Sequence, residues 1–151
     1  MDTTLEAEIE VAADPGAVWL LVSDPVRMAE WSPQVKSVRL KGEGPIGVGT
    51  RFTNRNADGE LEWSTHGEIV RYEPEREIAF RIEENWATWS VALEPTNAGT
   101  RLVQRRETPD GVSPLSKQFS DTIYGGVEAY GELMLAGMQE TLAAIKAAAE
   151  A

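Results

Sequence analysis

The sequence contains no cysteine and only one histidine, His66. The first absence excludes disulfides, thiol nucleophiles and thiolate metal sites, and the second excludes zinc sites built from several histidines. No apolar run approaches the ~20 residues that a membrane-spanning helix needs. The first dozen residues are rich in acidic side chains and lack the basic and then apolar opening of a signal peptide. We therefore expect a cytoplasmic protein with no membrane insertion, no metal and no cofactor.

Basic residues are also scarce, with 14 Lys and Arg against 25 Asp and Glu, a formal charge of −11. Nucleic acids and anionic lipid surfaces are bound mainly through clustered cationic side chains, so neither is an expected partner. The length of 151 residues suits one domain over 1–151. The oligomeric state stays open between a monomer and a homodimer.

The first two-thirds of the chain has the period and turn chemistry of strands. Residues 4–11 alternate strictly between apolar and polar, which predicts a half-buried strand. Asp14-Pro15 and Asp24-Pro25 then favour two short helices, the second ending near Ala29. Six further strands, separated by turn residues, are predicted at 35–41, 49–57, 60–72, 76–83, 87–94 and 100–107.

From Leu115 to Ile145 apolar residues recur every three or four positions, which predicts a single helix of about 35 residues. We expect Gly125-Gly126 to mark a bend or a close approach, and the alanine-rich end, 143–151, to fray. A long helix and a sheet with one apolar face must cover each other. The predicted fold is therefore α+β, a seven-stranded curved antiparallel sheet around a long C-terminal helix.

Several short segments, spread over the whole chain, resemble one superfamily. It is the helix-grip (SRPBCC) superfamily of the birch-pollen allergen, the StAR-related lipid-transfer domains and the bacterial polyketide cyclases/dehydrases, the last branch being nearest. The segments are Val11-Ala12-Ala13-Asp14-Pro15 with Val18-Trp19, Asp24-Pro25 to Trp31-Ser32-Pro33, Gly47 to Phe52, Tyr72-Glu73-Pro74, Gly99 to Leu102, and Gly137 to Leu142. The resemblance implies the helix-grip fold and a small-molecule ligand, but no particular reaction, because fold does not determine function.

Side-chain parity along the strands and the helix period predict an inner wall that is mainly apolar. A cavity of this kind suits a small hydrophobic molecule that is lipid-like, aromatic or polyketide-like. The alternative is that the aromatic side chains simply fill the interior. The residues predicted to contact the ligand are Trp31, Phe52, Asn54, Trp63, Thr65, Phe80, Trp89, Val91, Phe119, Ile123, Val127 and Met134.

Three functions remain open on this sequence. In a cyclase/dehydrase-like enzyme, Arg106, Gln104 and Tyr130 would polarise a carbonyl or stabilise an enolate without a cofactor. In a pure carrier or sensor, the same cavity would bind without catalysis. In a protein resembling the co-chaperone branch, the outer face of the sheet would bind a partner protein, although its charged residues make an apolar docking patch unexpected there.

Two further features carry weaker signals. Parity places His66 on the outer face of the sheet, where a solvated or Glu-paired histidine is expected rather than a general base. Residues 42–47 have the spacing of a dinucleotide-binding loop, but a strand follows instead of a helix. We interpret this loop as a strand connection that forms one lip of the cavity.

Overall fold

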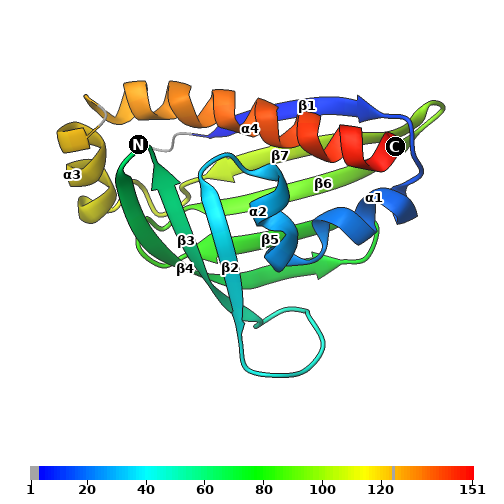
Figure 1. Ribbon diagram of the computed structural model, residues 1–151, viewed down its shortest axis with the longest axis horizontal. Coiled ribbons are helices and arrows are strands. Elements are labelled where there is room, and N and C mark those ends of the chain that lie inside the picture. The colour runs from blue at the N-terminus through cyan, green and yellow to red at the C-terminus, as the bar shows by residue number, and fades with distance from the viewer. Residues whose placement is uncertain (1–3, 124) are drawn as a thin grey trace.

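The computed structural model describes residues 4–123 and 125–151, apart from the side chains of Val127 and Glu128. Seven antiparallel strands form one curved sheet in the order β1-β7-β6-β5-β4-β3-β2, and the C-terminal helix α4 crosses its concave side (Figure 1). This is the expected α+β helix-grip fold. The strands are β1 (Leu5–Val11), β2 (Val35–Lys41), β3 (Arg51–Asp58), β4 (Leu61–Glu73), β5 (Glu77–Ile82), β6 (Thr88–Thr96) and β7 (Gly99–Glu107).

The observed strands lie within two residues of the predicted bounds, and their register agrees with the predicted parity. Asn54 pairs with Thr65, Phe80 with Trp89, and both Trp89 and Leu5 flank Arg106. Pairing partners in an antiparallel ladder point to the same side of the sheet. A register shift between Ile69 and Arg71 keeps the apolar side chains of β4 facing inward beyond it.

The segment between β1 and β2 folds into short helical segments, and aspartate side chains cap the N-termini of α1 and η1. The helix α1 (Pro15–Val22) starts where Asp14 Oδ1 accepts a 2.8 Å hydrogen bond from the Ala17 amide. Asp24 caps the 3-10 turn η1 (Pro25–Arg27) in the same way, and α2 (Met28–Trp31) continues from it. The second helical segment therefore reaches Trp31, two residues beyond the predicted end.

The prediction of one unbroken C-terminal helix is wrong. The chain forms α3 (Pro114–Ile123) and α4 (Val127–Glu150), and the break lies at Gly125 and Gly126, whose φ angles are 80° and 124°. Such positive φ angles are open to glycine at little cost but are unfavourable for other residues. The glycine pair therefore ends one helix and turns the chain into the next.

The alanine-rich end of α4 does not fray, contrary to expectation. Lys146 Nζ donates a 2.9 Å hydrogen bond to the carbonyl of Glu10, and the amide of Ala12 donates a 2.7 Å bond to Glu150 Oε2. These contacts join the last turns of α4 to the end of β1. They fix one end of the helix over the sheet.

The two faces of the sheet differ in chemistry. The concave face packs against the helices around fully buried side chains such as Phe52, Ile69, Leu102 and Leu142. The convex face carries cross-strand ion pairs, among them Arg105 with Glu6 and Arg101 with both Glu8 and Glu94. None of the helices in the described part of the chain is both long and apolar enough to span a membrane.

Candidate ligand-binding cavity

A cavity of about 470 Å³ lies between the concave face of the sheet and the helices α2 and α4. Its size falls in the range of small-molecule sites, roughly 300–1,000 Å³. Strands β3 to β7 supply its floor, and Met134, Met138 and Ile145 of α4 supply its roof. The aromatic side chains therefore leave the interior partly hollow.

Most residues predicted to contact a ligand lie on this cavity. The lining includes Trp31, Asn54, Trp63, Thr65, Phe80, Trp89, Val91 and Met134 from the predicted set, together with Gln104 and Tyr130. Residues from α2, from the five strands β3 to β7 and from α4 thus converge on one space. Whether they bind a ligand stays a prediction.

Three of the predicted contact residues lie outside this lining. Phe52 is fully buried in the core, where its ring packs edge-on against Phe80 at 5.3 Å. Phe119 and Ile123 lie on α3, outside the lining, and Ile123 is 46% exposed. Before the break at the glycine pair, Ile123 faces solvent, whereas Phe119 contacts the rings of the lining residues Trp63 and Tyr130. Val127 begins α4, but its side chain lies outside the described part of the structure.

Many lining residues were missed from the sequence, among them Asn56, Met28 and Met138. Asn56 stands two positions after Asn54 on β3 and faces the same side, so strand parity alone could have identified it. Met28 and Met138 were not assigned to the cavity, because their positions depend on how α2 and α4 pack over the sheet. No local sequence signal indicates that packing.

Buried polar atoms without partners mark the walls of the cavity. Asn54 Oδ1 on β3 and Gln104 Oε1 on β7 have no hydrogen-bond partner among the described residues, although the two side chains are 4% and 8% exposed. The Nε of Arg106, also on β7 and 4% exposed, is unpaired in the same way. By contrast, Asn56 Nδ2 donates a 3.1 Å bond to Thr65 Oγ1. A buried hydrogen-bonding group without a partner lowers the stability of the fold unless water or a ligand forms a hydrogen bond to it.

Arg106 and Tyr130 form a polar pair at one end of the cavity. The Arg106 guanidinium lies over the Trp89 ring at 5.8 Å, next to the lining rather than on it. Burial lowers the pKa of Arg106, and the nearby Tyr130 raises it. No carboxylate of the described residues contributes to the pKa shift of Arg106. Burial likewise raises the pKa of Tyr130, while Arg106 lowers it. At neutral pH the pair is a cation beside an un-ionised phenol.

Aromatic rings close this end of the cavity. Phe119 of α3 contacts Trp63 at 5.4 Å and Tyr130 at 5.9 Å between ring centroids. The Asp58 carboxylate at the end of β3 is also close enough to raise the pKa of Tyr130. Tyr130 therefore lies near residues of both β3 and β7, the two strands that carry the unpaired atoms of Asn54 and Gln104 and that are separated in the sheet by β4, β5 and β6.

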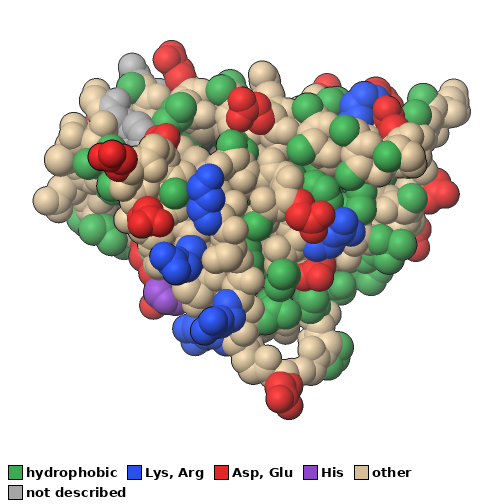
Figure 2. Space-filling view, in the orientation of Figure 1, with side chains coloured by type: hydrophobic (Ala, Val, Ile, Leu, Met, Phe, Trp, Pro, Cys, Tyr) green, Lys and Arg blue, Asp and Glu red, His purple; other side chains and the backbone are tan. Residues whose placement is uncertain are grey.

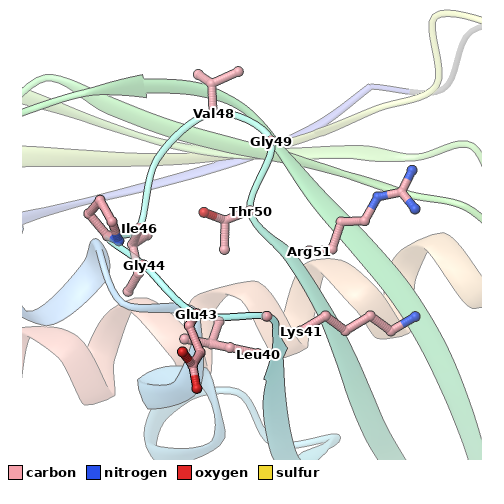
Figure 3. A pocket seen from close by; sticks show the side chains of 11 residues that line it. Leu40, Lys41, Glu43, Gly44, Ile46, Val48, Gly49, Thr50 and Arg51 are labelled. Carbon is pink, nitrogen blue, oxygen red and sulfur yellow. The ribbon is translucent and has the colours of Figure 1, made fainter.

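The loop between β2 and β3 encloses a separate hollow of about 520 Å³. One continuous stretch of chain, Leu40–Arg51, supplies its lining, and Figure 3 shows Val48 and Arg51 pointing out of the ring. In Figure 2 the loop projects from the body of the molecule as an open ring. Its glycine-rich residues do not reach the cavity under α4, so the expectation that the loop forms a lip is wrong.

His66 lies on the outer face, as its parity predicts. Its Nδ1 is 2.5 Å from Glu84 Oε2, so it is a Glu-paired surface histidine. With Glu83 it forms a group of side chains whose ligand atoms lie within 4.8 Å of one another and could hold a metal ion. Glu84 is hydrogen-bonded to His66 and Glu83 is exposed. None of the three residues is part of the cavity lining.

The sequence matches one family over almost its full length. A family model described as polyketide cyclase / dehydrase and lipid transport matches residues 2–150. The chain belongs to this family. No curated protein matches the sequence.

Several solved structures have the same architecture. A polyketide cyclase-like protein from Corynebacterium glutamicum is 31% identical, with a TM-score of 0.65 over 97% of this chain and 90% of that chain. The di-domain ARO/CYC protein StfQ from the steffimycin biosynthetic pathway is 15% identical, with a TM-score of 0.77 over 99% of this chain and 51% of that chain. An AHSA1-like protein from Aeromonas hydrophila is 18% identical, with a TM-score of 0.65 over 99% of this chain and 96% of that chain. The last two likenesses show the fold alone.

Proposed function

We propose that this protein binds a small, largely apolar molecule in the cavity between the sheet and α4. The observation that carries the proposal is a cavity of about 470 Å³ with aromatic and aliphatic walls and unpaired polar atoms inside. Apolar walls supply affinity by burial, and a few polar groups orient the bound molecule. Membership of a family of cyclases and lipid-transport proteins supports the same function.

The ionisable groups at the cavity favour binding over proton-transfer chemistry. The carboxylates among its lining residues are Asp24, Asp58 and Glu140, of which the last two are exposed at the rim. Asp24 is occupied as the cap of η1. A general base must reach the reacting proton from within the site, and none of the described lining residues meets that requirement.

A cyclase-type activity is the second candidate, and the pair of Arg106 and Tyr130 favours it. A buried cation and an un-ionised phenol beside Gln104 are donors that could stabilise an enolate as it develops. This chemistry works by positioning and electrostatics, so the lack of an internal base does not exclude it.

Native mass spectrometry of the purified protein, followed by denaturing extraction, tests the binding function. A retained small molecule that is absent after cavity filling supports it. The filling variant is Val91→Trp, because Val91 lies on the inner wall between Ile78 and Gln104. Its matched control is Val48→Trp in the exposed β2–β3 loop.

Either of two outcomes would contradict the proposal. The wild-type protein would show only its apo mass, and its melting temperature would not respond to fatty acids, sterols or aromatic polyketides. A folded Val91→Trp variant that binds as well as wild type would also contradict it, because the ligand would then lie elsewhere.

A further inference from the structure

Gln104 and Arg106 present complementary unpaired atoms on the same face of β7. They are two residues apart, which separates their Cα atoms by about 7 Å in a strand. The unpaired atom of Gln104 is an acceptor, Oε1, and that of Arg106 is a donor, Nε–H. Both side chains are more than nine-tenths buried.

A hydroxyl is the simplest uncharged ligand group that meets both atoms at once. A hydroxyl donates one hydrogen bond and accepts others, so it can donate to Gln104 Oε1 and accept from Arg106. A ketone, an ether or a carboxylate only accepts, and it would leave Gln104 Oε1 buried and unpaired. An ammonium group only donates, and it would add a second cation beside Arg106.

A second acceptor on the cavity lining has the same preference. Asn54 Oδ1 on β3 is an unpaired acceptor, and the cavity reaches both Asn54 and Gln104. The strands between β3 and β7 contribute apolar lining residues, among them Val91, Ile78 and Phe80. Among the described lining residues, the unpaired buried side-chain atoms are therefore two acceptor oxygens on separate strands.

From this arrangement we infer that the ligand is a hydroxylated apolar molecule, an alcohol or a phenol, whose hydroxyl groups donate to Gln104 and Asn54. The inference rests on the proposed function, since it names the class of molecule that the cavity accepts. It distinguishes this class from purely carbonyl-bearing chains and from carboxylates. The unpaired donor Nε–H of Arg106 lies two residues along β7 from Gln104, next to the lining.

Three probes of one shape separate these possibilities. 2-Naphthol offers a hydrogen-bond donor and an acceptor, and 2-methoxynaphthalene offers only an acceptor. 2-Methylnaphthalene offers neither and is nearly the same size as 2-naphthol. Dissociation constants come from titrations that follow tryptophan fluorescence, with calorimetry as the second method. We expect 2-naphthol to bind about tenfold more tightly than either analogue, the effect of one buried hydrogen bond.

The matched variants are Gln104→Met and Asn54→Leu, which keep the side-chain size and remove the acceptor. Each should reduce the preference for 2-naphthol, and the double variant should abolish it, while Gln139→Met on the exposed side of α4 changes nothing. The melting temperature is a separate readout. Since the removed oxygens are unpaired in the ligand-free protein, the double variant should be at least as stable as wild type.

The outcomes distinguish this inference from the proposed function. Equal binding of the three probes, all blocked by Val91→Trp, would overturn the hydroxyl preference and leave the binding function standing. Tighter binding of 2-methoxynaphthalene would overturn it too, as would a folded double variant that keeps the preference for 2-naphthol. A marked loss of stability in the double variant would show that both oxygens are structural, which also overturns it. Failure of all three probes, with no co-purified molecule, would count against the binding function itself.

Discussion

Replacing Gly67 by alanine should destabilise the protein, because the ring of Phe52 occupies the place of a side chain there. Gly67 and Phe52 are pairing partners on β4 and β3. A Cβ added at Gly67 would lie 2.5 Å from Phe52 Cζ, 2.7 Å from Cε2 and 3.1 Å from Cε1. Carbon atoms in contact prefer roughly 3.5–4.0 Å, so the ring would have to move by about 1 Å.

Phe52 has little room for that movement. It is fully buried and packs edge-on against Phe80, which lines the cavity. Overpacking of this kind costs about 1–3 kcal/mol. For a domain of this size the melting temperature should fall by about 3–10 °C, measured by circular dichroism and confirmed by urea unfolding. Displacement of Phe80 should also weaken ligand binding.

The matched control is Gly131→Ala in α4, where an added Cβ would meet nothing within 4 Å. Alanine is favoured over glycine inside a helix by about 1 kcal/mol, so this variant should be more stable than wild type. The same substitution is therefore expected to have opposite signs at the two sites. A Gly67→Ala protein as stable as wild type would show that Phe52 does not pack as described.

Three further changes test other parts of the structure. Glu150→Gln should lower stability at pH 7 by weakening the bond from the Ala12 amide, which is the main reason the Glu150 pKa is lowered. A carboxylate with a lowered folded-state pKa stabilises above its unfolded pKa and loses that effect as pH falls, so the melting temperatures of the two proteins should converge as the pH falls through the lowered pKa of Glu150. A constant difference would contradict this. Arg106→Met should leave the melting temperature of the ligand-free protein unchanged or raise it by about 2–4 °C, because the cation over Trp89 has no carboxylate partner among the described residues. A clear fall in melting temperature would show that Arg106 stabilises the fold. Replacing loop 42–48 with a short hairpin turn should leave ligand affinity unchanged in a titration, because the loop does not line the cavity; lost affinity would place the loop at the site.

Much of the sheet could be predicted because its signals are local. The alternation in 4–11, the turn residues between strands and the parity of each strand depend only on neighbouring residues. The glycine pair Gly125-Gly126 indicated the place of the bend between α3 and α4, but not that the helix ends there. The apolar period continues across it from Ile123 to Val127, and only the backbone angles at the two glycines show the interruption.

The cavity was predictable on the sheet side and less so on the helix side. Parity identified Asn54 and Gln104 as inward-facing, and the register confirms that orientation. Whether an inward side chain lines a space or fills the core depends on what packs across from it. Phe52 fills the core because its partner on β4 is a glycine, a relation that appears only when the two strands are paired.

Methyl signals of methionine would show where a ligand binds. The sequence has four methionines, and Met28, Met134 and Met138 line the cavity from α2 and α4. In a protein labelled with ¹³C at the methionine methyl groups, saturating 2-naphthol should shift all three cavity signals, and Val91→Trp should abolish these shifts. If the three signals stay in place while the ligand demonstrably binds, the cavity under α4 is not the binding site.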